Sequence, residues 1–216
     1  FIEKPLVSTA AELEALVAAQ QKAGVVVGVG HHDHGTCATS RFVRRLVQSG
    51  DLGRIASVEA VTCHSGGLVL KPGDWRGDPT KNPGGMLFQC GVHSLHELAF
   101  YFGPVKEVYC RQRSDVHEGS QTADAACCLL TFHSGLIGTL NAYHVTPYRG
   151  LVSIYGTKSN LYLGTRLPDG ATWTEESGTP RPSTAILRQD LPPKLDGSVE
   201  PIVPLAVPKD EFNDPT

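Results

Sequence analysis

The feature that most constrains the fold is a series of strand-like segments in the second half of the chain. These segments are residues 105–113, 125–132, 136–145, 151–155 and 160–163. His133-Ser-Gly135 separates the second segment from the third, and another glycine-containing turn separates the last two, which is typical of β-hairpins. Consecutive hairpins predict an antiparallel sheet.

The first thirty residues predict a different arrangement. Thr9 followed by Glu12 is a capping box and Gly24 is a typical helix end, so we expect a helix from about residue 10 to Ala23. Residues 25–29 form a valine-rich run between glycines, which predicts a buried parallel strand. A parallel unit followed by an antiparallel sheet indicates an α/β (α+β) fold with two subdomains. The junction of two subdomains is a usual place for a ligand cleft.

The segment between these parts predicts helices around a long loop. One helix ends at Gly50, a strand covers residues 55–61, and another helix runs from Gly84 to Gly103. Residues 65–83, between that strand and that helix, are rich in glycine and proline. Loops of this length in a compact domain are often functional.

A polar stripe follows one face of the helix that begins at Gly84. At 100° per residue, Gln89, His93 and His96 fall within about 60° of one another. Gly85 lies one turn earlier, where the missing side chain lets a ligand or the backbone approach closely. The functional hypothesis is a substrate-facing surface with His93 as general acid or base, because an ordinary imidazole titrates near neutral pH. The alternative is a solvated helix face.

Lys4 is the second candidate for chemistry. Pro5 fixes its own φ angle and keeps Lys4 out of helical geometry, so Lys4 ends the first strand. The carboxyl end of a parallel strand is where open α/β sheets bind ligands. The alternative is an ordinary surface lysine at a strand end.

Two histidine groups suggest a metal-dependent hydrolase as an alternative function. That hypothesis would use His31, His32, His34, His93 and His96. Their spacing does not match the zinc-hydrolase motifs, so we expect no metal. The histidines after residue 30 are then a polar loop at a strand end.

The long loop contains Trp75 and Arg76, a flat aromatic ring next to a fork-shaped cation. The pair could stack on a ring or bind a phosphate or carboxylate. The alternative is a loop that the tryptophan anchors.

Composition excludes several classes of partner. Lys plus Arg number 19 and Asp plus Glu number 22, a net charge of −3, so no basic excess exists to neutralise a nucleic-acid backbone. No run of 18 apolar residues exists, so we expect no membrane span. The six cysteines include no Cys-x-x-Cys pair, and we interpret them as thiols of a reducing cytosol, which predicts a cytoplasmic protein. Adjacent Cys127 and Cys128 should point to opposite faces of a strand.

Several short motifs occur in a consistent order between residue 1 and about residue 165. Residues 1–6 contain Glu-Lys-Pro, which resembles a motif at the end of a Rossmann strand, and residues 84–93 resemble Gly-Gly-x-x-x-Asp-x-Gly-x-His. Residues 27–31 and 154–157 resemble recurrent strand motifs, and Trp75-Arg76 resembles a pair that contacts a nicotinamide cofactor. In order and spacing, these motifs resemble the Gfo/Idh/MocA family, which includes glucose–fructose oxidoreductase and inositol dehydrogenases.

This resemblance implies a domain division and an activity. Residues 1–30 would be the C-terminal remnant of a dinucleotide-binding Rossmann domain. Residues 31–216 would be a substrate and oligomerisation domain, incomplete at its C-terminus, with a large open and mainly antiparallel sheet. The implied reaction is hydride transfer between NAD or NADP and a carbinol carbon of a sugar, cyclitol or related polyol. The implied assembly is a homo-oligomer formed through the open sheet.

The resemblance also implies residue roles. Lys4 would bind the substrate hydroxyl and the nicotinamide ribose, and His93 would exchange the hydroxyl proton. Substrate contacts would come from Gln89, His96 and His31. The residues expected to contact the cofactor are Glu3, Lys4, Pro5, Trp75 and Arg76.

Two departures from the family pattern limit these expectations. Gln89 stands at the family's aspartate position, so a carboxylate contact with the substrate is replaced by an amide. The glycine-rich turn that holds the pyrophosphate is expected before residue 1, so we expect the chain alone to bind NAD(P) poorly. A third hypothesis is therefore a non-catalytic module whose open sheet mediates oligomer contact.

Overall fold

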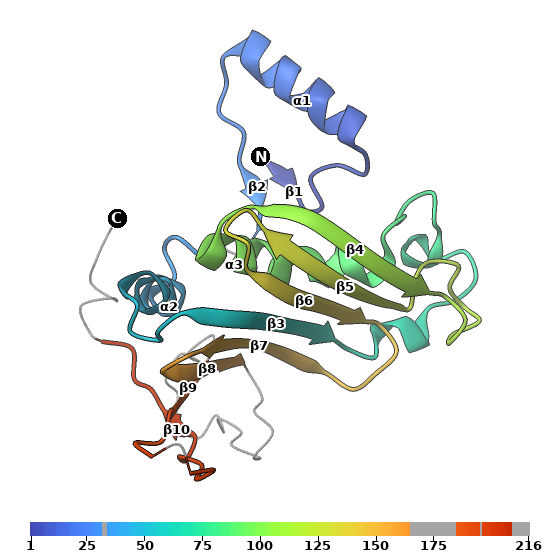
Figure 1. Ribbon diagram of the computed structural model, residues 1–216. Helices are drawn as coiled ribbons and strands as arrows, with labels where there is room; N and C mark the ends of the chain where they lie inside the picture. Colours follow the sequence, from blue (N-terminus) through green and yellow to red (C-terminus); the bar gives the residue numbers. More distant parts are fainter. Residues whose placement is uncertain (32–33, 165–184, 195, 209–216) are drawn as a thin grey trace, which may run out of the picture.

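The computed structural model describes residues 1–31, 34–164, 185–194 and 196–208. Its main element is an eight-stranded sheet in the order β10-β9-β8-β7-β3-β6-β5-β4 (Figure 1). The strands are β3 (Ile55–Cys63), β4 (Val105–Arg113), β5 (Ala125–Phe132), β6 (Ile137–Tyr143), β7 (Arg149–Gly156), β8 (Ser159–Gly164), β9 (Ala185–Asp190) and β10 (Val203–Pro204). The predicted hairpins β5–β6 and β7–β8 are confirmed.

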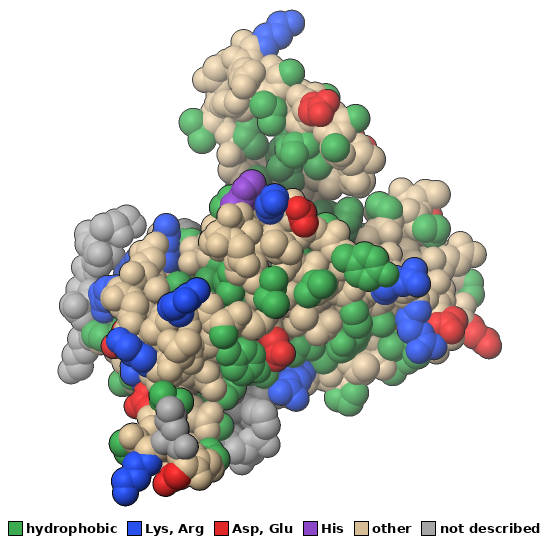
Figure 2. Space-filling model, in the orientation of Figure 1, with side chains coloured by type: hydrophobic (Ala, Val, Ile, Leu, Met, Phe, Trp, Pro, Cys, Tyr) green, Lys and Arg blue, Asp and Glu red, His purple; other side chains and the backbone are tan. Residues whose placement is uncertain are grey.

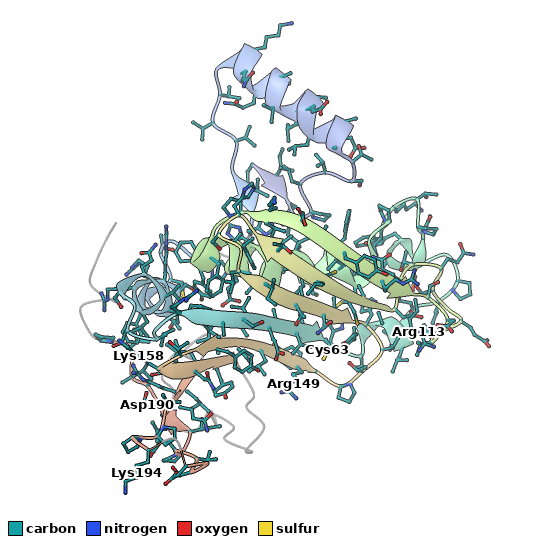
Figure 3. All side chains as sticks on the ribbon, in the orientation of Figure 1. Cys63, Arg113, Arg149, Lys158, Asp190 and Lys194 are labelled. Carbon is teal, nitrogen blue, oxygen red and sulfur yellow. The ribbon has the colours of Figure 1, made fainter. Side chains whose placement is uncertain are left out.

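The sheet is antiparallel except where β3 lies beside β6. β3 pairs parallel with β6 and antiparallel with β7, which places it in the middle of the sheet. Direct pairing aligns Arg113, Ala125, Tyr143, Cys63 and Arg149 across five strands. Figure 3 labels three of these residues at one end of the sheet and Lys158 toward the other.

Two helices, α2 (Ala38–Ser49) and α3 (Val92–Phe102), pack with one face of the sheet into a single core. They contribute the buried side chains Phe42, Val43, Leu98 and Tyr101. In β5, even-numbered residues from Ala126 to Phe132 are buried, whereas Cys127 and Leu129 are exposed. This period of two confirms that Cys127 and Cys128 point to opposite faces. The opposite face of the sheet carries exposed apolar side chains (Figure 2).

A small unit of β1 (Ile2–Glu3), α1 (Ala10–Ala23) and β2 (Val29–Gly30) stands beside the sheet (Figure 1). β1 and β2 pair in parallel, and α1 has the predicted capping box and ends at Gly24 in the left-handed conformation. The helix contributes no buried residue.

The prediction of a buried strand over residues 25–29 is wrong. The strand begins only at Val29, and Val25 and Val26 are 51% and 96% exposed. The reason is that β1 pairs only with Val29 and Gly30, so among the described residues Val25 and Val26 have no ladder partner and stay exposed. The division of the chain at residue 30 stays a prediction.

The long loop and the helix after it are more detailed than the sequence predicts. The loop contains two short 3-10 helices, η1 (Gly66–Val69) and η2 (Trp75–Gly77). The helix begins with a π-helical turn, η3 (Leu87–Gly91), and continues as α3. Among the described residues, no helix is both long and apolar enough to span a bilayer.

Candidate functional site

The entry to η3 is fixed by a close backbone contact at Gly85. Gly85 has φ +52°, and a Cβ there would lie 2.4 Å from the carbonyl oxygen of Ala123. The Met86 amide donates to the same oxygen. The sequence predicts that either a ligand or the backbone approaches Gly85 closely. In the structure it is the backbone of Ala123, just before β5, that lies against Gly85.

The structure brings Lys4 to the polar stripe. Lys4 follows β1, and its Nζ donates a hydrogen bond to the carbonyl oxygen of Gln89 in the π-helical turn. The two residues are 85 positions apart in the sequence. π-helical turns are frequent at functional sites because they break the regular hydrogen-bond ladder. Lys4 thus lies against the backbone of the element that carries Gln89 and leads into His93.

The stripe also meets the histidines that follow β2. The ring centroids of His31 and His93 are 5.8 Å apart and edge-on, and those of His31 and His96 are 4.7 Å apart and stacked. His34 continues the cluster at 5.3 Å from His96, and its Nδ1 lies 2.9 Å from Ser40 Oγ. Figure 2 shows histidine and charged side chains at the junction between the N-terminal unit and the sheet.

Gln89 has a buried polar atom without a partner. Its Nε2 is inaccessible to solvent and has no hydrogen bond to any residue that the structure describes. A buried donor left unpaired costs about 1–3 kcal/mol. Such an atom, on the residue whose backbone carbonyl binds Lys4, is a suitable donor for an oxygen of a bound molecule.

A second cluster next to this site escaped the sequence analysis. His64 follows β3 and His144 follows β6, and their rings lie 4.8 Å apart. Cys90 Sγ lies 3.6 Å from His64 Nε2, and the His64 Nδ1 accepts a hydrogen bond from the Gly66 amide. The sequence signal that could have identified this cluster is the place of the two histidines, since His64 comes directly after β3 and His144 directly after β6.

Burial and nearby cations control ionisation in this second cluster. Burial, with a smaller contribution from the neighbouring His64, lowers the pKa of His144 to about 4. Burial, with a smaller contribution from Arg76, also lowers the pKa of His64. Burial raises the pKa of the Cys90 thiol, while Lys4 and Arg76 oppose that change. The cluster is therefore a neutral polar surface beside two cations.

The remaining predicted cofactor residues lie on exposed surfaces. Glu3 and Pro5 flank Lys4 and are exposed. The Arg76 guanidinium lies 4.6 Å from the centroid of the half-exposed Trp75 ring. The carbonyl of Arg76 accepts hydrogen bonds from Asn82 and Thr122. The loop that carries the Trp-Arg pair is thus attached to the segment before β5.

Two observations bear on the hydrolase hypothesis and on the position of a pocket. Among the described residues, no three His, Cys, Asp or Glu side chains are grouped as metal ligands. His32, which the hydrolase hypothesis requires, lies outside the described residues. A hollow of about 200 Å³ lies between β8, β9 and residues 198–200, and none of the predicted site residues lines it.

The curated proteins to which this chain is similar include an oxidoreductase and a reductase. An oxidoreductase of Bacillus subtilis, YfiI, is 27% identical over 192 residues, which cover 82% of this chain and 48% of the relative. The 1,5-anhydro-D-fructose reductase of Ensifer adhaerens is 27% identical over 163 residues, covering 74% of this chain and 47% of the relative. The chain thus spans about half the length of these curated relatives.

Solved structures share the fold. An oxidoreductase from Desulfitobacterium hafniense superposes with a TM-score of 0.76 and 27% identity, covering 87% of this chain and 53% of that one. Levoglucosan dehydrogenase in complex with NADH and levoglucosan has a TM-score of 0.73 at 16% identity, covering 94% of this chain and 53% of that one. The second likeness is one of fold alone.

A family model covers more than half of the chain. The model of the GFO/IDH/MocA C-terminal domain matches residues 40–162, from α2 through β8. These residues contain the long loop, the π-helical turn and six strands of the sheet. The chain belongs to the Gfo/Idh/MocA family.

Proposed function

We propose that this chain supplies the substrate-binding and proton-transfer groups of an NAD(P)-dependent oxidoreductase. The substrate is a sugar, cyclitol or related polyol, oxidised or reduced at a carbinol carbon. Curated relatives named as a 1,5-anhydro-D-fructose reductase and a scyllo-inositol 2-dehydrogenase support this class. The observation that carries the proposal is the contact of Lys4 with Gln89, one helical turn before His93.

Oxidation of a carbinol requires removal of a tightly held hydroxyl proton. The imidazole of His93 is the base that takes this proton, and it returns the proton in reduction. The Lys4 ammonium stabilises the negative charge that develops on the oxygen. The unpaired Gln89 Nε2 donates to a second oxygen of the substrate, as an amide can where the family's aspartate would accept.

The exposed groups near this site suit a nicotinamide nucleotide. Trp75 offers a half-exposed flat ring, Arg76 a cation, and Lys4 an ammonium at the strand end. These residues, with Glu3 and Pro5 beside Lys4, would hold the nicotinamide end of NAD or NADP. When bound, nicotinamide supplies the hydride acceptor in oxidation and the hydride donor in reduction.

The test is hydride transfer by the full-length protein, followed by nicotinamide absorbance with a panel of sugars and cyclitols. Lys4→Met and His93→Gln should each lower kcat/KM by about 100-fold or more. His93→Gln should also remove one ionisation from the dependence of the rate on pH. Lys158→Met, toward the other end of the sheet (Figure 3), is the control and should leave turnover unchanged. Unchanged turnover in both site variants would refute the roles proposed here.

We further propose that the protein is a cytoplasmic homo-oligomer that binds neither nucleic acid nor membrane. The face of the sheet opposite α2 and α3 supports assembly with a second copy, since Tyr109 and Leu129 are 63% and 50% exposed on it. Six free cysteines suit a reducing compartment. The net charge of −3 supports the absence of a nucleic-acid partner.

A further inference from the structure

We propose that Cys110 and Cys128 form a modification site, a pair of thiols that closes to an intramolecular disulfide across β4 and β5. The two residues are direct partners in the antiparallel ladder between these strands. Their Sγ atoms lie 2.9 Å apart, and the thiol of Cys128 donates to the sulfur of Cys110. This pairing joins the edge strand β4 to its neighbour.

The backbone already has the geometry that a disulfide needs. Direct partners in an antiparallel pair have Cα atoms about 4.5–5.5 Å apart. A disulfide spans Cα separations of about 4.4–6.8 Å. Both side chains point to the same face, because Cys128 is part of the main core and Cys110 packs against it. Closure therefore requires a small side-chain rotation and no movement of the strands.

Three other cysteines have different neighbours. The Cys63 thiol donates to the carbonyl of Pro147, Cys90 lies against His64, and Cys127 lies against the hydroxyl of Tyr143 on the opposite face of the sheet. Cys127 is next to Cys128 in the sequence and is more exposed, which makes it a matched control.

The reaction is a thiol–disulfide exchange with a low-molecular-weight disulfide such as glutathione disulfide. Cys110 is the better-exposed partner, and its thiolate attacks the oxidant to form a mixed disulfide and release one glutathione. Cys128 then loses its proton and attacks the Cys110 sulfur, and the second glutathione leaves. Two protein thiols are oxidised, one glutathione disulfide is reduced, and the two protons end on the released thiols.

The loop that this disulfide closes includes the segment that supports the candidate site. Residues 111–127 contain Thr122, which binds the carbonyl of Arg76, and Asp124, whose carbonyl accepts from the amide of His144. Closing a loop of this size restricts the unfolded chain and should raise the melting temperature by about 5–10 °C. The modification therefore cross-links the two strands that hold the ends of the segment to which the Trp-Arg loop is attached.

The experiment equilibrates the 216-residue chain with glutathione disulfide and maps the products by peptide mass spectrometry. The expected product has lost two hydrogen atoms and joins the peptide of Cys110 to that of Cys128. Cys128→Ala and Cys110→Ala should each lose the cross-link. Cys127→Ser should retain the cross-link, which would show that Cys128, and not its neighbour Cys127, is the partner of Cys110. The melting temperature should rise on oxidation in the parent chain and in Cys127→Ser only.

Two results would overturn the proposal. One is a glutathione adduct on Cys127 with no cross-link at Cys110, which would show that the oxidant reacts with the chain but not with this pair. The other is a cross-link that survives in Cys128→Ala and disappears in Cys127→Ser, which would assign the reactive partner to the other face of the sheet.

Discussion

At the scale of single residues, Gly85 and His144 show how close backbone contact and burial shape the candidate site. Gly85 combines a left-handed backbone with a contact that leaves no room for a side chain. His144 is 3% exposed and carries an imidazole whose pKa burial lowers to about 4. Both features contact the segment just before β5. The Ala123 carbonyl lies against Gly85, and the Asp124 carbonyl accepts a hydrogen bond from the His144 amide.

Gly85→Ala should destabilise the chain by about 3 kcal/mol, because a left-handed alanine costs about 1–2 kcal/mol and the new methyl group also meets a backbone oxygen. Gly24→Ala is the matched control, since Gly24 has φ +66° and nothing within 4 Å of a Cβ. Its cost should stay near 1 kcal/mol. The measurement is urea unfolding, and equal losses in the two variants would contradict the role given to the Ala123 contact.

His144 should make the fold sensitive to acid. Its ordinary pKa of 6.5 applies to the unfolded chain, whereas the folded value is about 4. Between these values the unfolded chain binds a proton that the folded chain does not. Stability should therefore be complete above about pH 6.5, fall by about 2–3 kcal/mol as the pH decreases toward 4, and fall no further from this cause.

The measurement is the free energy of unfolding at about pH 7.5 and about pH 5 for the parent chain and His144→Leu. For each protein, the free energy of unfolding at the lower pH is subtracted from that at the higher pH. The change in packing that leucine introduces is the same at both pH values and cancels in this difference. The variant should lose less stability on acidification. An identical loss would mean that other groups cause the acid sensitivity.

At the scale of elements, α1 and the sheet differ in what stabilises them. The sheet derives its burial from the helices α2 and α3 and from alternate residues of each strand. The capping box of α1 is complete, since Thr9 Oγ1 accepts from the Glu12 amide and the Glu12 carboxylate accepts from the Thr9 amide. With no buried residue, the helix depends on such local interactions, so its opening should be independent of global unfolding.

Thr9→Ala should therefore speed amide exchange in the first turn of α1 by about fivefold, the equivalent of a lost cap of about 1 kcal/mol. The global free energy of unfolding should not change. Ser8→Ala is the control, because Ser8 contributes its backbone amide to Glu12. A loss of global stability in Thr9→Ala would mean that α1 is coupled to the sheet.

At the scale of the whole molecule, the exposed apolar face of the sheet opposite α2 and α3 predicts assembly of the chain with itself. Leu129→Lys places a charge on this face, in the strand beside the edge strand β4, and should shift the protein toward monomer in sedimentation experiments. Val199→Lys, at a 79% exposed position after β9, should leave the oligomeric state unchanged. A monomeric parent protein, or an oligomer equally stable in both variants, would contradict assembly through this face.

Much of the fold could be predicted from the sequence because its signals are local. Thr9 and Glu12 are three residues apart, the glycines at 24, 50 and 103 directly follow the helices that they end, and the hairpins close over short turns. The failure over residues 25–29 has the same origin. A valine-rich run favours a strand, but burial depends on partners, and β1 provides none for the valines before residue 29.

The sequence alone determined the three α-helices and the strands from β3 to β8 in their order, the polar stripe of Gln89, His93 and His96, and the family that its motifs resemble. Only the tertiary structure decided that β3 lies between β6 and β7, that Lys4 binds the backbone of Gln89, and that His64 and His144 meet beside Cys90. The physical reason is that helix caps, turns and alternation depend on neighbouring residues. Contacts across 80 or more positions, such as those of His64 with His144 and of Lys4 with Gln89, depend instead on which strands pair and how helices pack, and no local spacing encodes that choice.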